Sequence, residues 1–142
     1  MEKDNIRRRR FDLKLRISAL TIIAAGMLLH TYTGFFKTSG KIDLFSLKII
    51  GLSWLPYLVC LVLALAIRTP LIPLCGAILP LILDLMMYYS VFIHPTSSTS
   101  AIGLLFMPLW NLVLFMPIGL LAGFLIVRFK KRKSVSFDKI TS

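Results

Sequence analysis

Asp84 is the residue with the clearest capacity for chemistry, because it is an acidic side chain inside a long apolar stretch. A carboxylate in the middle of a bilayer costs roughly 2.5–3.5 kcal/mol on insertion scales, so it is expected to face a partner or water. His30 lies in another apolar stretch and is a potential partner. A nearby carboxylate favours the protonated imidazole, and such a pair could exchange a proton near neutral pH.

Several polar residues fall at one depth when positions are counted from the basic ends of the apolar runs. His30 comes 14 residues after Arg16, and Asp84 comes 16 residues after Arg68. At 1.5 Å per helical residue, this layer lies roughly 21–26 Å from the basic end of the runs. The faces agree, because Asp84 and His30 each share a helical side with small residues at three- and four-residue steps. The sequence therefore predicts an intramembrane polar cluster of Asp84, His30, Tyr88, Asn111 and Ser53.

Two interpretations of this polar cluster stay open. It is either a hydrogen-bonded staple that fixes helix packing, or a site for a proton, an ion or a polar substrate. Asparagine at position 84 would keep the shape of the side chain and remove its charge. If Asp84→Asn leaves both the fold and the phenotype unchanged, the functional interpretation fails.

Catalytic and cofactor-binding motifs are absent from the sequence. It contains no Walker loop, GxGxxG, HExxH, paired-cysteine motif or GxSxG. His94 precedes Pro95 at the expected end of an apolar run, where a helix would stop, and is expected to be a cap or loop residue. The remaining histidine and carboxylate are too few for a metal site. We therefore expect a non-catalytic protein with no metal and no cofactor.

Four apolar runs must position the polar side chains: 17–36, 49–67, 71–93 and 101–127. Each is long enough for the roughly 20 helical residues that cross a bilayer core of about 30 Å. None alternates polar and apolar residues as a membrane barrel strand does. The predicted fold is all-α, an integral membrane bundle of four transmembrane helices formed by residues 17–127.

The charged residues set the predicted orientation. Only 16% of the residues are charged, against about 25% in a soluble domain. Most of the net charge of +11 lies in segments 1–16 and 128–142, so the positive-inside rule predicts that both termini are cytoplasmic, in a multi-pass protein of the inner (plasma) membrane. No folded basic face outside the membrane exists for nucleic acid. Contacts with anionic lipid headgroups are expected from eight basic residues: Arg7, Arg8, Arg9, Arg10, Lys130, Lys131, Arg132 and Lys133.

Small and aromatic residues predict how the helices pack. Gly26 lies on the His30 side of the first run, and Gly119 with Gly123 forms a GxxxG pattern, which lets another helix of this chain or of a second copy approach closely. Trp54 and Tyr57 are expected in an aromatic belt at the outer end of the second run. Residues 42–49 could form a short interfacial helix or an earlier start of that run.

One nine-residue stretch, 111–119, is similar to the NxxxFxPxG stretch of the VanZ-like membrane proteins associated with glycopeptide resistance. The rest of the chain does not follow that family, and we take no function from the resemblance.

Three functions fit the sequence. The first is a non-catalytic accessory or scaffold subunit of a membrane assembly, with a membrane-protein partner or a second copy of the chain. The second is a small-solute or ion transporter that uses Asp84 and His30. The third is a lipid-modifying membrane enzyme.

Overall fold

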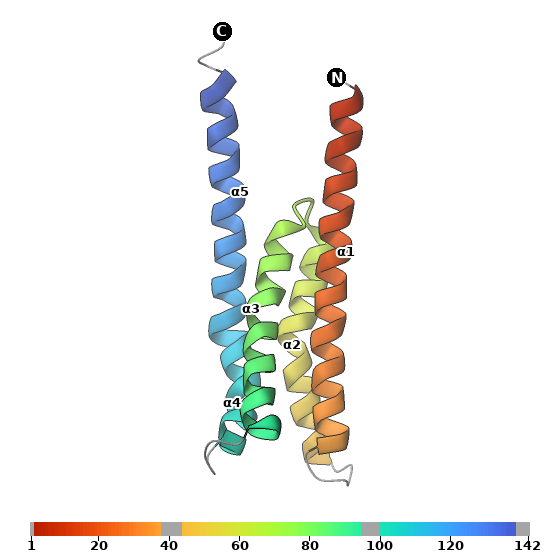
Figure 1. Cartoon of the computed structure of the whole chain (residues 1–142), viewed down its shortest axis with the longest axis vertical. Helices are drawn as coiled ribbons and strands as arrows, with labels where there is room; N and C mark the ends of the chain where they lie inside the picture. The colour runs from red at the N-terminus through yellow and green to blue at the C-terminus, as the bar shows by residue number, and fades with distance from the viewer. Residues whose placement is uncertain (1, 38–43, 95–99, 139–142) are drawn as a thin grey trace.

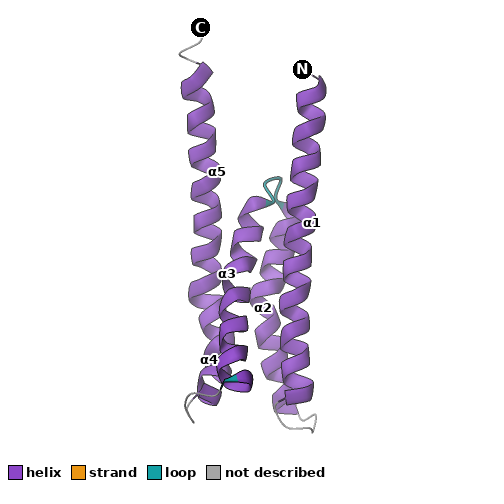
Figure 2. Cartoon of the chain, in the orientation of Figure 1, coloured by secondary structure: helices purple, strands orange, loops and turns teal. Residues whose placement is uncertain are grey.

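The computed structural model describes residues 2–37, 44–94 and 100–138, and every secondary-structure element in these ranges is helical (Figures 1 and 2). This confirms the all-α prediction. The α-helices are α1 (Glu2–Tyr32), α2 (Leu44–Ala66), α3 (Leu71–Tyr88), α4 (Ser100–Trp110) and α5 (Met116–Asp138). Three π-helical turns accompany them: η1 (Thr33–Lys37), η2 (Tyr89–Ile93) and η3 (Asn111–Phe115).

Four helical stretches of the described residues are long and apolar enough to cross a membrane: Arg9–Phe36, Leu47–Ala66, Leu71–Ile93 and Phe106–Lys130. The fourth combines most of α4, the η3 turn and most of α5. Large apolar side chains are exposed on each stretch, as a bilayer requires of the face that it covers. Examples, one from each stretch, are Leu28, Val62, Met86 and Val113, all at least 60% exposed.

The central helix of the bundle is α3, which packs against α1, α2 and α5. Both chain termini lie at one end of the bundle, together with the turn that joins α2 to α3 (Figure 1). At that end α1 and α5 extend well beyond the turn. Residues 2–16 and 128–138, which carry many of the basic side chains, are therefore helical and continuous with the first and fourth spans.

The glycines of the GxxxG pattern bring α5 against the backbone of α3. A Cβ atom at Gly119 would lie 2.5 Å from the carbonyl oxygen of Cys75 and 2.9 Å from the Cα of Gly76. A Cβ atom at Gly123 would lie 2.9 Å from the Cα of Ile72. Of the two packing partners that the sequence left open, the structure shows a helix of the same chain.

A π-helical turn interrupts the fourth span at the point where the spacing between its buried residues changes. The backbone N–H of Met116 donates to the carbonyl of Asn111, five residues back. The next residue, Pro117, has no N–H to donate, so the regular α-helical pattern is also broken there. The buried positions on this face run Met107, Asn111, Met116, Gly119, Gly123, with a five-residue step across the π turn.

Arg16 joins α1 to the end of α2. Its Nη2 atom donates to the carbonyl oxygen of Ile67 at 3.1 Å. The last carbonyls of a helix have no partner within the helix, so this contact satisfies one of them.

The helix that contains Trp54, α2, begins at Leu44 and continues without a break to Ala66. Residues 44–49 are therefore an earlier start of the second span. Of the residues proposed for a separate interfacial helix, Ile42 lies outside the described ranges.

Candidate functional site: the Asp84 cluster

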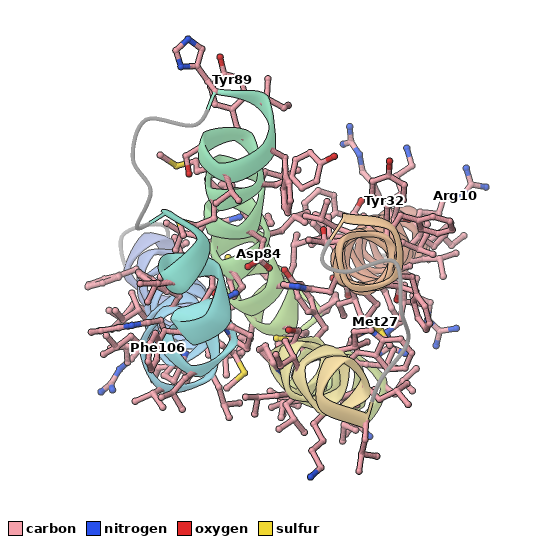
Figure 3. All side chains as sticks on the ribbon, turned by 90° about the horizontal axis from the view of Figure 1, so that it is seen from below. Arg10, Met27, Tyr32, Asp84, Tyr89 and Phe106 are labelled. Carbon is pink, nitrogen blue, oxygen red and sulfur yellow. The ribbon has the colours of Figure 1, made fainter. Side chains whose placement is uncertain are left out.

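Four side chains from the four spans meet near the end of the bundle opposite the termini. They are His30 of α1, Tyr57 of α2, Asp84 of α3 and Asn111 of η3, and we call them the Asp84 cluster. Tyr57 and Asn111 are fully buried, and Asp84 is 4% exposed. Figure 3 looks along the helices and shows Asp84 inside the bundle, while Arg10, Tyr89 and Phe106 point outwards.

The Asp84 carboxylate accepts hydrogen bonds from the three other side chains of the cluster. Tyr57 donates its hydroxyl to Oδ2 at 2.5 Å, and His30 Nε2 lies 2.8 Å from the same oxygen. Asn111 donates its Nδ2 to Oδ1 at 2.6 Å. Hydrogen bonds to a carboxylate are about twice as strong as those between neutral groups, so this arrangement suits an ionised Asp84.

Gly26 makes room for Tyr57 within the cluster. The tyrosine ring occupies the space where a side chain at position 26 would lie, one helical turn from His30. The two rings, of His30 and Tyr57, stand 5.9 Å apart between their centroids and are tilted by 54°. Glycine therefore lets α1 approach α2 closely enough for both rings to reach one carboxylate oxygen.

The direction of the helices explains why Tyr57 reaches Asp84. Side chains lean towards the N-terminus of their own helix. The N-terminus of α2 lies at the end of the bundle opposite the chain termini, which is the end nearer to the cluster. The long phenol of Tyr57 therefore extends along the bundle to the carboxylate. The expectation that Tyr57 belongs to an aromatic belt was wrong, since a belt residue faces the membrane interface and this side chain is fully buried.

The structure places the other two predicted cluster residues apart from the carboxylate. Ser53 is buried, but its hydroxyl donates to the backbone carbonyl of Ile49 at 2.9 Å. Tyr88 lies one helical turn beyond Asp84, and its ring is packed against Phe92 with 5.2 Å between the centroids. Of the five predicted residues, the structure joins His30, Asp84 and Asn111 by hydrogen bonds.

Asn111 occupies an unusual position in two respects. It is the first residue of a π-helical turn, a feature that often occurs at functional sites. Its side-chain oxygen Oδ1 is buried and has no hydrogen-bond partner among the residues that the structure describes. A buried acceptor without a donor costs free energy, and this oxygen can still accept a hydrogen bond.

A metal ion has no obvious ligand set here. Among the described residues, no group of three or more His, Cys, Asp or Glu side chains is close enough to hold one. His94 is exposed at the end of η2, and its backbone N–H donates to the carbonyl of Tyr89.

The predicted headgroup contacts lie at the end of the bundle that carries the termini. Arg7, Arg9 and Arg10 are exposed on α1, and Lys130 is exposed on α5. The side chains of the remaining four predicted residues lie outside the described ones: Arg8, Lys131, Arg132 and Lys133.

The chain matches no protein-family model, no curated protein and no solved structure. The resemblance of residues 111–119 to VanZ-like proteins therefore gains no support from the family comparison. The structure establishes an all-helical chain with four helical stretches, within its described residues, that are long and apolar enough to span a membrane.

Proposed function

We propose that this protein is a small, non-catalytic accessory or scaffold subunit of a membrane assembly. The observation that carries the proposal is that side chains of the same chain bond to both carboxylate oxygens of Asp84. Both carboxylate oxygens already accept hydrogen bonds, so the cluster ties the four spans together instead of presenting a free carboxylate to a substrate.

The charge distribution supports an inner (plasma) membrane location with both termini in the cytoplasm. Exposed basic residues of α1 and α5 gather at the end of the bundle that carries the termini, as the positive-inside rule requires of the cytoplasmic side. Arg68, in the turn between α2 and α3, lies at the same end. Anionic lipid headgroups would contribute about 1 kcal/mol for each basic side chain near the surface.

Capture from native membranes tests the accessory-subunit proposal. The chain, with a tag at its C-terminus, is extracted in nanodiscs or mild detergent and analysed by native mass spectrometry. We expect a different membrane protein at fixed stoichiometry, whose amount in the membrane falls when the chain is deleted. Recovery of the chain alone, or only as self-oligomers, would overturn the proposal.

A second candidate function, transport of a small solute or ion, is favoured by the exposure of His30. Its side chain is 15% exposed, against 2% for Asp84, so it connects the buried carboxylate with the outside of the bundle. Proton-coupled uptake into liposomes that is lost in Asp84→Asn and kept in Tyr88→Phe would select this candidate. The tyrosine variant is a suitable control because Tyr88 lies one turn from Asp84 and packs on Phe92.

A further inference from the structure

While Asp84 is ionised, the charge of the Asp84 cluster depends on His30 alone. Tyr57 and Asn111 are neutral donors, and Asp84 has no salt bridge to a lysine or arginine among the described residues. With a neutral His30 the cluster carries one net negative charge inside the bundle. With a protonated His30 the pair is neutral overall, and an unpaired buried charge is avoided.

Among the side chains that contact Asp84, His30 is the one that can take up a proton. From α2 the cluster is faced by Tyr57, which already donates to Asp84, and from η3 by the uncharged amide of Asn111. On α3, the next titratable residue after Asp84 is Tyr88, whose ring lies against Phe92. Cys60 is the other titratable residue of the core around Tyr57. It lies one helical turn after Tyr57, farther from Asp84 along α2.

His30 is the most exposed member of the Asp84 cluster. It lies six residues before Phe36, where the first span ends, or about 9 Å along the helix axis. That end of the span is opposite the chain termini, so it is the nearer end of the bundle from which a proton could be supplied to the pair.

Asn111 gives the carboxyl group a partner in either protonation state. In the structure its Nδ2 donates to Oδ1 of an ionised Asp84, and its own Oδ1 has no partner in the described chain. After rotation of the amide by 180°, that oxygen would instead accept a hydrogen bond from a protonated carboxyl group. The site can therefore hold a proton on either side of the His30–Asp84 contact without losing the link to η3.

We propose that the His30–Asp84 pair binds one exchangeable proton, taken from the end of the bundle opposite the termini, and that this proton sets how tightly α1 is held. The proton comes from water, is held between His30 Nε2 and Asp84 Oδ2, and returns to water. The side-chain hydrogen bonds that hold α1 to its neighbours include one from Arg16 to Ile67, just after α2, and one between His30 and Asp84 of α3. Loss of the proton replaces an imidazolium–carboxylate contact by a weaker one with a neutral donor.

Nitrogen NMR of labelled histidine tests the proton directly. The chain has two histidines, so the His94→Gln variant leaves His30 as the only one, on a chain whose cluster is unchanged. We expect the His30 ring in nanodiscs to gain a proton as the pH is lowered and to lose it as the pH is raised. A ring that keeps one state at every pH at which the bundle stays folded overturns the proposal.

A double-mutant cycle tests the link to α1. Stability is measured for the wild type, His30→Gln, Asp84→Asn and the double variant at about pH 5 and about pH 8. The coupling between the two residues should be larger at the lower pH, because a contact between two opposite charges then replaces one between a neutral donor and a carboxylate. Equal coupling at both pH values would mean that the contact is a fixed staple. Neither measurement depends on a partner protein, so this proposal and the accessory-subunit proposal can fail separately.

Discussion

Gly26 of α1 lies against the ring of Tyr57 of α2, so that a Cβ atom at position 26 would overlap the ring atoms Cε1 and Cζ. The ring has little freedom to move aside, since it is fully buried and its hydroxyl is bonded to Asp84. A single methyl group at position 26 would therefore act on the polar cluster through the ring of Tyr57.

Gly26→Ala is accordingly expected to destabilise the bundle by about 1–3 kcal/mol, the usual range for overpacking. Gly51→Ala is the matched control, because a Cβ atom at Gly51 would meet no atom within 4 Å. Thermal unfolding in nanodiscs should show a loss for the first variant and little change for the second. Equal effects would show that the contact with Tyr57 is not what requires glycine.

Gly119→Ala should destabilise the packing of α5 on α3 by more than Gly26→Ala destabilises the packing of α1 on α2. The atoms in the way at Gly119 belong to the backbone of Cys75 and Gly76, which cannot rotate aside as a side chain can. Gly103 provides the control, because its nearest neighbour is the terminal methyl group of Met87. Hydrogen exchange of the α5 amides should accelerate in Gly119→Ala and stay unchanged in Gly103→Ala.

Tyr57→Phe removes one donor from Asp84 and keeps the ring in place. We expect a cost of about 1–2 kcal/mol, at the upper end of the range for hydrogen bonds between membrane helices, because the acceptor is a carboxylate. Tyr88→Phe should have almost no effect on stability. If the two variants are equally stable, the hydroxyl of Tyr57 does not contribute to the staple.

Topology mapping checks the predicted orientation. A reporter that is active only outside the cytoplasm should be inactive at the C-terminus and active when inserted in segment 95–99, between the third and fourth spans. Replacing the basic residues of segment 1–16 by glutamine should weaken this preference, because lysine and arginine near span ends set orientation. An active C-terminal fusion contradicts the proposed arrangement.

The sequence was informative about which segments cross the bundle and at what depth their polar residues lie. Apolar length alone located four spans, and counting from Arg16 and Arg68 placed His30 and Asp84 in one layer. In the structure, Nε2 of His30 lies 2.8 Å from Oδ2 of Asp84. Depth along a helix follows from a constant rise per residue, so it can be read from the sequence without knowledge of the packing.

The members of the cluster were harder to predict, because reach and competing bonds decide them. Ser53 was included because of its depth along the second span, but its short side chain bonds to its own backbone at Ile49. Serine in a helix often does this. Tyr57 shares a helical face with Ser53 and lies one turn away, so its long side chain was the available signal. The lean of side chains towards the N-terminus of α2 carries its hydroxyl to Asp84.

The π turn at η3 was not predicted, because no residue pattern requires it before the packing partners are known. A proline does not mark such a turn, because Pro56, Pro73, Pro80 and Pro108 lie inside regular α-helices. What distinguishes the η3 turn is the pair of contacts on its two sides, Asn111 with Asp84 and Gly119 with the backbone of α3.

Those two contacts lie on one face only because the π turn absorbs one residue. Asn111 and Gly119 are eight residues apart, which in a regular α-helix separates them by about 80° around the axis. With one residue fewer the angle falls to about 20°. The fourth span therefore carries one residue more than a straight α-helix needs to make both contacts. Deletion of Val113, which is exposed, should leave a regular helix that still presents both faces to α3 and a bundle close to wild type in stability. Deletion of the equally exposed Val62 of α2 should rotate the two halves of that helix by about 100° and disrupt the fold.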